Sequence, residues 1–208
     1  MIFVLPGMGA DHRMYHAPVW QALPSARFID WPQHQGERSI AGLAERVITD
    51  ERIQDGDTVI GSSLGGIVGC EIANRRKLGA LVLVGSASAP DEIAALLRLL
   101  HPLAALAPLE FIRAAAGKLP GELCEMFASS QAAFLRAMCR AIFEWQGLAP
   151  DRIRPLRIHG KNDHVIPAPP TADLLIDGGH LIAMTHPDQC VSFIGKHLPR
   201  PVAEEPAG

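Results

Sequence analysis

The residues best suited to chemistry form a Gly-x-Ser-x-Gly pattern, Gly61-Ser62-Ser63-Leu64-Gly65. The pattern follows a short apolar run over 58–60 and precedes a helix-like segment over 67–77. A serine on a sharp turn between a strand and a helix is held at the edge of a sheet, where its hydroxyl can attack a carbonyl carbon. We therefore predict that Ser63 is a nucleophile, with Ser62 as its flanking residue.

A serine hydroxyl is a weak nucleophile at neutral pH, so it needs a base and a group that orients that base. Asp163 is the predicted acid, because it follows a strand-like run over 153–158 and would reach the same sheet edge as Ser63. His180 is the predicted base, just past the last expected strand on a Gly-Gly loop. Weaker alternatives remain open, and these are Asp177 and Asp91 for the acid and His164 and His186 for the base.

The negative oxygen of a tetrahedral intermediate needs two backbone N–H donors. Leu64 supplies one, as the residue after the nucleophile. The loop Leu5-Pro6-Gly7-Met8-Gly9 follows the first expected strand, and its glycines let the backbone come close to a substrate. We therefore expect Met8 N–H to be the second donor.

The elements that must position these groups alternate along the chain. Apolar runs predict strands, and apolar spacing of three to four residues predicts helices, with Ser39 as the N-cap candidate of one of them. The expected strands are 2–5, 27–31, 58–60, 80–84, 153–158 and 173–176, and the expected helices are 12–23, 40–53, 67–77 and 181–197. This alternation predicts an α/β fold, with a doubly wound, mainly parallel sheet covered by helices on both faces.

The stretch 91–147 breaks the alternation. It is rich in Ala and Leu, lacks a convincing strand and predicts short helices over 91–101, 103–116, 122–129 and 131–145. We expect residues 1–90 and 148–198 to form the core, 91–147 an all-helical lid above the strands' carboxyl ends, and 199–208 a loose tail. A peripheral helical extension without substrate contact is the alternative.

Apolar side chains of this stretch are candidates for an acyl pocket, although their helical spacing makes most of them core residues. They are Leu97, Leu100, Met126, Phe127, Phe134, Met138 and Phe143. His12, Arg13 and Tyr15 follow the first loop and are candidates for substrate contact, with surface placement as the alternative.

Composition excludes several classes of protein. Of the 208 residues, 48% are hydrophobic and 20% are charged, and the net charge of −3 gives no reason to expect a nucleic-acid partner. No membrane span and no signal segment are apparent, so we expect a cytoplasmic protein. The four cysteines form no metal-ligand pattern and predict buried free thiols, so no metal site is expected.

Five segments in this order resemble the motifs of the α/β-hydrolase superfamily, over nearly the whole chain. The loop 5–9 resembles its H-G-x-G oxyanion loop, and the segment 30–39 its D-x-P-G-x-G-x-S segment. Gly61–Gly66 resembles its nucleophile elbow, the segment 159–163 its H-G-x-x-D acid loop, and Gly179-His180 its closing G-H. Three features depart from the family: Pro6 stands where the family often has His, Gln33 and Gln35 interrupt the second motif, and the first antiparallel hairpin is missing. A trimmed sheet of about six strands follows.

The resemblance implies a Ser63-His180-Asp163 triad that hydrolyses an ester or thioester through an acyl-enzyme, without a metal or organic cofactor. A small-molecule substrate with a small or medium apolar acyl group is the expectation. The same scaffold hosts C–C bond hydrolases, lyases and cofactor-free peroxidase-like activities, so these chemistries are alternatives. A ligand-binding protein with an idle triad is a third. Neither the substrate nor the oligomeric state follows from the sequence.

Overall fold

Six strands form one parallel sheet in the order β2-β1-β3-β4-β5-β6. The computed structural model describes residues 1–93 and 121–198. The strands are β1 (Ile2–Leu5), β2 (Ala26–Phe28), β3 (Thr58–Ser62), β4 (Ala80–Val84), β5 (Leu156–Gly160) and β6 (Leu174–Ile176). Every pairing between neighbouring strands is parallel, which sharpens the prediction of a mainly parallel sheet of about six strands.

The order of the strands reverses between β1 and β3. From β1 the chain passes outward to β2 on one side, and it then returns to β3 on the other side of β1. The segments that leave the carboxyl ends of β1 and β3 therefore diverge and open a crevice between them. Gly7 and Met8 follow β1, and Ser63 follows β3, so the sheet brings these residues to the same crevice.

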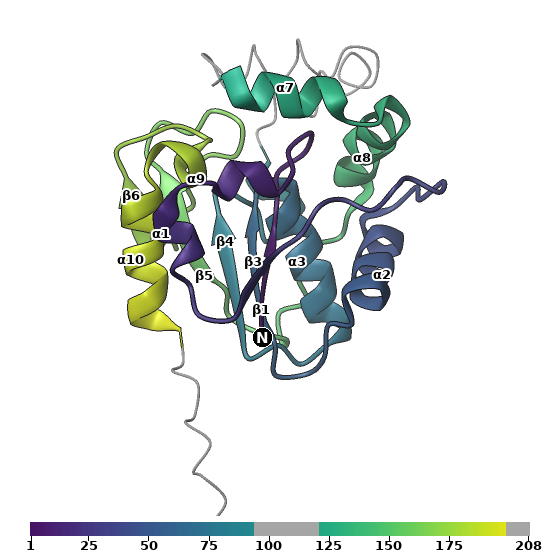
Figure 1. Ribbon diagram of the computed structural model, residues 1–208. Helices are drawn as coiled ribbons and strands as arrows, with labels where there is room; N and C mark the ends of the chain where they lie inside the picture. Colours follow the sequence, from purple (N-terminus) through teal and green to yellow (C-terminus); the bar gives the residue numbers. More distant parts are fainter. Residues whose placement is uncertain (94–120, 199–208) are drawn as a thin grey trace, which may run out of the picture.

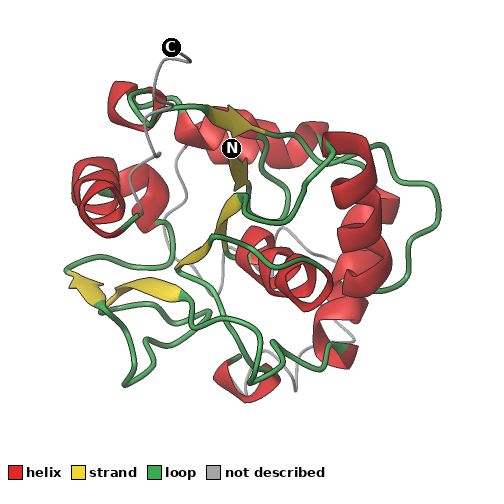
Figure 2. Ribbon diagram, turned by 90° about the horizontal axis from the view of Figure 1, so that it is seen from below, coloured by secondary structure: helices red, strands yellow, loops and turns green. Residues whose placement is uncertain are grey.

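Helices cover both faces of the sheet (Figures 1 and 2). One face carries α2 (Ile40–Glu51) and α3 (Leu64–Arg75), and the other carries α1 (Pro18–Gln21), α9 (Ile182–Thr185) and α10 (Pro187–His197). Each face buries its own apolar cluster. β1 and β4, which lie between the two clusters, are continuous apolar runs, as expected of strands buried on both faces.

Several element boundaries differ from the sequence-based prediction, and proline accounts for two of them. The expected helix over 12–23 is a 3-10 turn, η1 (His12–Tyr15), followed by α1 with Pro18 at its first turn. The expected helix over 181–197 is divided into α9 and α10, with Pro187 at the start of the second. Proline has no N–H to donate and fits the first turn of a helix, so it ends one helix and begins another.

Other boundaries are set by pairing between strands rather than by local composition. β2 covers 26–28 instead of 27–31, and β5 covers 156–160 instead of 153–158, because β5 pairs with β4 from Leu156 onward. α3 begins at Leu64 rather than at 67, directly after Ser63. The elbow is therefore tighter than the sequence indicated.

The helical insertion lies over the carboxyl ends of the strands (Figure 1). Its described parts are η2 (Pro90–Glu92), α7 (Gly121–Ser129) and α8 (Ala132–Glu144). The expected helix over 103–116, most of that over 91–101 and the tail 199–208 lie outside the described residues. Leu97 and Leu100 lie outside them as well.

An ion pair holds the chain where the insertion begins. The guanidinium of Arg157, on β5, donates to both carboxylate oxygens of Glu92 over 2.6 and 2.7 Å. Burial of Glu92 opposes its ionisation, but the hydrogen bonds from Arg157 and from the backbone N–H groups of Ser88 and Ala89 hold its pKa below the usual value.

α3 holds the chain where the insertion returns to the core. Trp145 Nε1 donates to Glu71 Oε1 over 3.0 Å, and Asn74 pairs with the backbone of Gly147 and Ala149 over 3.1 and 2.9 Å. The helix that follows Ser63 therefore also anchors the insertion.

None of the helices in the described part of the chain combines the length and apolarity that a membrane span requires.

Candidate active site

Ser63 lies on a strained turn between β3 and α3. Its backbone has φ 51° and ψ −118°, outside the regions that L-residues normally occupy. The turn is possible because its glycines lack side chains: a Cβ at Gly65 would lie 2.5 Å from Leu5 O, and a Cβ at Gly61 would overlap the backbone of Gly65. Ser63 N–H donates to Val84 O over 3.2 Å, which ties the turn to the next strand.

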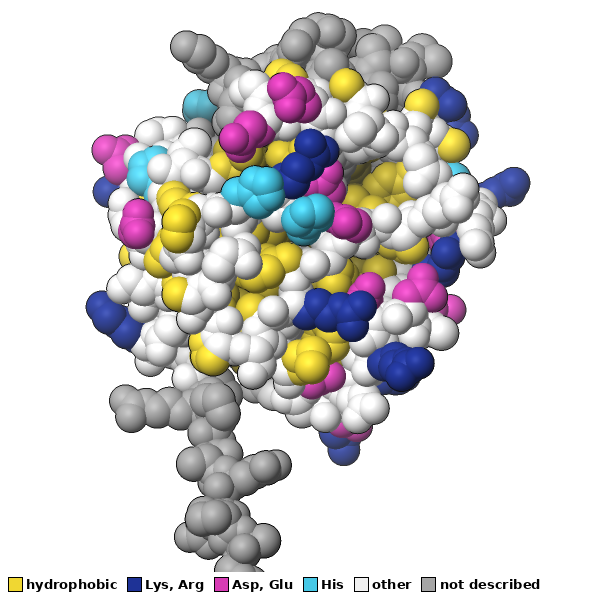
Figure 3. Space-filling model, in the orientation of Figure 1, with side chains coloured by type: hydrophobic (Ala, Val, Ile, Leu, Met, Phe, Trp, Pro, Cys, Tyr) yellow, Lys and Arg dark blue, Asp and Glu magenta, His cyan; other side chains and the backbone are white. Residues whose placement is uncertain are grey.

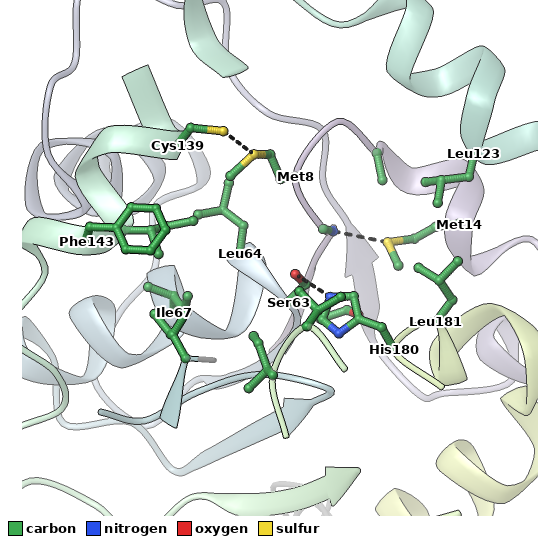
Figure 4. A pocket seen from close by; sticks show the side chains of 17 residues that line it. Met8, Met14, Ser63, Leu64, Ile67, Leu123, Cys139, Phe143, His180 and Leu181 are labelled. Carbon is green, nitrogen blue, oxygen red and sulfur yellow. Dashed lines mark hydrogen bonds between the residues drawn. The ribbon is translucent and has the colours of Figure 1, made fainter. Parts of the chain in front are cut away.

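A chain of hydrogen bonds joins Ser63, His180 and Asp163. His180 Nε2 lies 3.0 Å from Ser63 Oγ, and His180 Nδ1 lies 2.8 Å from Asp163 Oδ2 (Figure 4). A carboxylate can only accept, so Nδ1–H donates to Asp163 and Nε2 is the nitrogen that accepts from the serine hydroxyl. His180 and Asp163 are both buried. This is the arrangement in which imidazole takes a proton from serine.

Asp163 is fixed by its own loop. Its Oδ1 accepts hydrogen bonds from Val165 N and Ile166 N, each over 2.9 Å, which leaves Oδ2 for His180. Close packing brings the two loops together, because a Cβ at Gly160 would overlap the carbonyl oxygens of Gly178 and Gly179. The glycine of the 159–163 motif therefore lets the last loop lie against the end of β5.

The loop after β1 lies beside Ser63. A Cβ at Gly7 would be 3.7 Å from Ser63 Cβ, and the loop is held by Trp31 Nε1, which donates to Gly7 O over 3.0 Å. No described residue accepts a hydrogen bond from Met8 N–H. Leu64 is the first residue of α3, so its N–H has no acceptor within the helix. Both predicted oxyanion donors thus lie next to the nucleophile, Met8 in the loop after β1 and Leu64 at the start of α3.

A cavity of about 110 Å³ opens above Ser63. Glycine and apolar side chains form most of its wall, and the polar groups that reach it among the described residues are Ser62, Ser63, His180 and the thiol of Cys139. Burial raises the pKa of Cys139 to about 11, so its thiol stays protonated. The described part of the site therefore offers one reactive centre in an apolar cavity.

Ser63 divides the cavity into two sides (Figure 4). On one side lie Leu64, Ile67, Cys139 and Phe143, and on the other, beside His180, lie Met14, Leu123 and Leu181. Met8 borders the first side, where its sulfur accepts a hydrogen bond from Cys139 Sγ over 3.5 Å.

The predicted pocket residues divide into two groups. Phe143 lines the cavity as expected. Met126, Phe127, Phe134 and Met138 are buried but do not line it. Phe127 packs on Gly9, where a Cβ would overlap its ring, and Phe134 packs on Trp31 with ring centroids 5.7 Å apart. These four attach the helical insertion to the core.

His12 and Tyr15 do not reach the cavity. Tyr15 is fully buried under the loop after β1, where its hydroxyl donates to Leu5 O over 2.7 Å. His12 lies on the surface and pairs with Asp30 over 2.8 Å, and Arg13 pairs with Asp11. Figure 3 shows histidine, acidic and basic side chains gathered over this part of the molecule. The prediction that His12, Arg13 and Tyr15 contact the substrate is therefore wrong, because each of them bonds to a neighbouring residue outside the cavity.

Asp11, His12 and Asp30 bring three possible ligand atoms within 4.8 Å of one another. His12 and Asp30 are exposed, Arg13 holds the carboxylate of Asp11, and among the described residues no comparable group adjoins Ser63.

The alternatives for the acid and the base lie elsewhere. Asp177 accepts a hydrogen bond from Asn162 over 3.4 Å, and His186 pairs with its neighbour Thr185. His164 is exposed, and Asp91 is an exposed residue of η2.

The sequence-based prediction missed Met14, Ile67, Leu123, Cys139, Ile142 and Leu181 as lining residues. One signal for them was present: 135, 139 and 142 form a second apolar stripe on α8, beside the stripe of 134, 138 and 141. Periodicity shows two stripes but does not tell which one faces a cavity.

A model of the alpha/beta hydrolase family matches residues 2–193. No curated protein matches the chain significantly.

Solved structures share the fold at low sequence identity. A thermophilic esterase from Thermogutta terrifontis, with malate bound, is 17% identical at a TM-score of 0.74, over 94% of this chain and 88% of that one. The N-acyl homoserine lactonase AidH, as a mutant complexed with N-hexanoyl homoserine, is 15% identical at a TM-score of 0.73, over 98% of this chain and 91% of that one. The type II thioesterase BorB from the borrelidin biosynthetic cluster is 21% identical at a TM-score of 0.64, over 95% of this chain and 90% of that one. At these identities the likeness establishes the fold alone.

Proposed function

This chain belongs to the alpha/beta hydrolase family, and from that premise we propose that it is a serine hydrolase of small or medium apolar carboxylic esters or thioesters. The observation that carries the proposal is the continuous hydrogen-bond chain from Ser63 through His180 to Asp163 at an apolar cavity. An idle triad would have no need for a strained nucleophile turn.

In the first step Ser63 Oγ attacks the carbonyl carbon while its proton passes to His180 Nε2. The carbonyl oxygen becomes an oxyanion, which the N–H groups of Leu64 and Met8 stabilise. Asp163 stabilises the protonated imidazole and keeps its Nδ1–H directed at the carboxylate. The intermediate collapses when His180 gives its proton to the leaving alcohol or thiol, and the acyl group remains on Ser63.

In the second step a water molecule attacks the acyl-enzyme. His180 takes the proton of the water, and the same two N–H groups stabilise the new oxyanion. When this intermediate collapses, the proton returns to Ser63 Oγ and the carboxylic acid leaves. No residue outside the triad and the two donors needs to transfer a proton.

The walls of the cavity support an apolar substrate. Transfer of a methylene group from water to such a wall contributes about 0.8 kcal/mol, so each additional buried methylene should tighten binding until the cavity is full. The small volume of the cavity favours short acyl groups.

A panel of p-nitrophenyl esters, acyl-CoAs and an N-acyl homoserine lactone tests the proposal. We expect turnover of short-chain esters and labelling of the protein by a fluorophosphonate probe. Ser63→Ala should abolish the labelling and lower kcat by about 10⁴-fold or more. Ser62→Ala is the matched control and should keep both.

Three results would contradict the proposal. Labelling that survives in Ser63→Ala but not in Ser62→Ala would move the nucleophile. A folded wild-type protein that neither reacts with the probe nor hydrolyses any ester, yet binds a small apolar molecule tightly, would favour the ligand-binding alternative. Reaction with the probe without turnover of any ester or thioester would favour C–C bond hydrolysis or a lyase reaction.

A further inference from the structure

A second histidine, His159, lies beside the acid, and the proposed reaction does not use it. It belongs to β5, four residues before Asp163, and it is fully buried. Its Nε2 lies 2.9 Å from Ile166 O and 3.7 Å from Asp163 Oδ2. Its Nδ1 is buried and has no hydrogen-bond partner among the described residues.

These contacts determine the protonation of His159. A carbonyl oxygen can only accept, so Nε2 carries the hydrogen and donates it to Ile166 O. A second proton on Nδ1 would be a buried donor without an acceptor, which is costly. His159 is therefore the neutral tautomer with its hydrogen on Nε2.

The surroundings of His159 keep the ring neutral. Burial lowers the pKa of His159 below its ordinary value, and the charges of Arg157 and His180 act in the same direction. Asp163 and the hydrogen bond to Ile166 O oppose this shift without cancelling it. A charged ring 3.7 Å from Asp163 would attract the carboxylate and compete with His180 for it.

Ile166 is bonded to His159 and also to Asp163. Ile166 accepts from His159 through its carbonyl oxygen and donates to Asp163 Oδ1 through its N–H. Val165 N–H makes the second bond to the same oxygen. The two donors direct Oδ1 into the loop, and Oδ2 then faces His180.

We propose that His159 is a positioning residue for the acid: its neutral Nε2–H holds Ile166, and through it Asp163, in the orientation that presents Oδ2 to His180. The inference rests on the proposed function, because it assigns a task within the same triad.

Three substitutions separate this role from simple packing. His159→Gln places an amide N–H near the position of Nε2, so it can still donate to Ile166 O. His159→Asn carries the same chemical group on a shorter side chain, near the position of Nδ1, and cannot reach Ile166 O. His159→Phe fills the volume without a donor. Gln is thus the rescuing variant, and Asn is its matched control.

The first measurement needs no substrate. In protein labelled with ¹⁵N-histidine, wild-type His159 should give the spectrum of a neutral ring protonated at Nε2. The downfield resonance of the His180 proton that binds Asp163 should persist in the Gln variant. It should be shifted or lost in the Asn and Phe variants, with thermal unfolding recorded to confirm that each variant folds.

The second measurement uses the ester that the wild type hydrolyses best. The Asn and Phe variants should lose about tenfold or more in kcat with a change in KM below about threefold, while Gln stays within about threefold of wild type. The acidic limb of their pH profiles should move to lower pH, because a misaligned carboxylate stabilises the protonated imidazole less.

The two measurements distinguish failure of the proposed role of His159 from failure of the proposed function. An unchanged His180 resonance and an unchanged acidic limb in folded Asn and Phe variants would overturn the role of His159, as would a doubly protonated His159 in the wild type. A wild type without hydrolysis, whose His180 resonance still depends on residue 159, would refute the proposed function but not the positioning of Asp163.

Discussion

At the scale of single residues, the site depends on a serine held in an unfavourable conformation. A residue outside the usual backbone regions costs about 1–3 kcal/mol, so the surroundings must hold it there. Ser63 N–H donates to Val84 O over 3.2 Å, and Ser86 Oγ donates to Ser63 O over 2.7 Å. Both peptide groups of the strained residue are thus bound to the end of β4 and the residues after it, and the hydroxyl remains free to face His180.

The orientation of the imidazole is the most sensitive part of the triad. Asp163→Asn should lower kcat by about 10⁴-fold with little change in folding, because the amide can donate to Nδ1 and thereby favours the wrong tautomer. Steady-state kinetics with a short ester and thermal unfolding measure the two effects.

Asp177→Asn is the matched control for this prediction. Asp177 is a neighbouring aspartate whose only recorded side-chain contact among the described residues is with Asn162, so its loss should leave kcat within about twofold of wild type. Equal losses in the two variants would show that Asp163 is not the acid.

At the scale of elements, α8 carries two apolar stripes with different tasks. Phe134 and Met138 face the core beside α2 and the segment around Trp31, whereas Cys139, Ile142 and Phe143 face the cavity. A helix with apolar residues on adjacent stripes can attach the insertion and line the cavity at once. We therefore expect one stripe to set the acyl-chain preference of the site and the other to contribute to the stability of the fold.

The two stripes can be tested separately. Ile142→Phe should narrow the cavity and shift the preferred p-nitrophenyl ester to a shorter acyl chain, by about one carbon on the basis of the added volume. Phe134→Ala should leave the preferred chain length unchanged and lower the free energy of unfolding by about 3–5 kcal/mol. Activity across an ester series and urea unfolding give the readouts, and a chain-length shift in Phe134→Ala alone would reverse the assignment.

At the scale of the whole molecule, the reversal of strand order places the site. The segments after β1 and β3 diverge at the crevice between these strands, and the loops after β5 and β6 bring Asp163 and His180 to the same edge. The approach is close enough that only glycine fits at position 65, where α3 starts against the end of β1.

The close approach at Gly65 predicts how one added methyl group would change the stability of the protein. Gly65→Ala should lower the free energy of unfolding by about 1–3 kcal/mol or more, because its Cβ would meet backbone atoms of Leu5 and Pro6 that cannot move independently. Gly195→Ala, in α10, is the matched control: a Cβ there meets nothing within 4 Å, so it should stabilise the protein by roughly 0.5–1 kcal/mol. Urea unfolding measures both, and a neutral Gly65→Ala would contradict the packing described.

Much of the fold could be predicted because local signals and tertiary structure agree. The strands 2–5 and 80–84 are continuous apolar runs, and they occur where predicted. The errors lie where pairing with a neighbouring strand determines the end of a strand. β5 begins later than predicted because its pairing with β4, and not its composition, sets its first residue. The break at Pro187 was readable from the sequence and was missed because the apolar spacing continues across it.

The sequence by itself determined the order of strands and helices and the glycine-flanked turns that place Ser63, Asp163 and His180 after strands. These features are local, because turn chemistry and apolar period act over a few residues. Only the tertiary structure decided which side chains line the cavity. Tyr15, Met126, Phe127, Phe134 and Met138 are apolar or aromatic enough to line it, yet they pack elsewhere. Burial follows from the apolar character of a side chain, but the direction in which a buried side chain points depends on contacts between segments far apart in the chain.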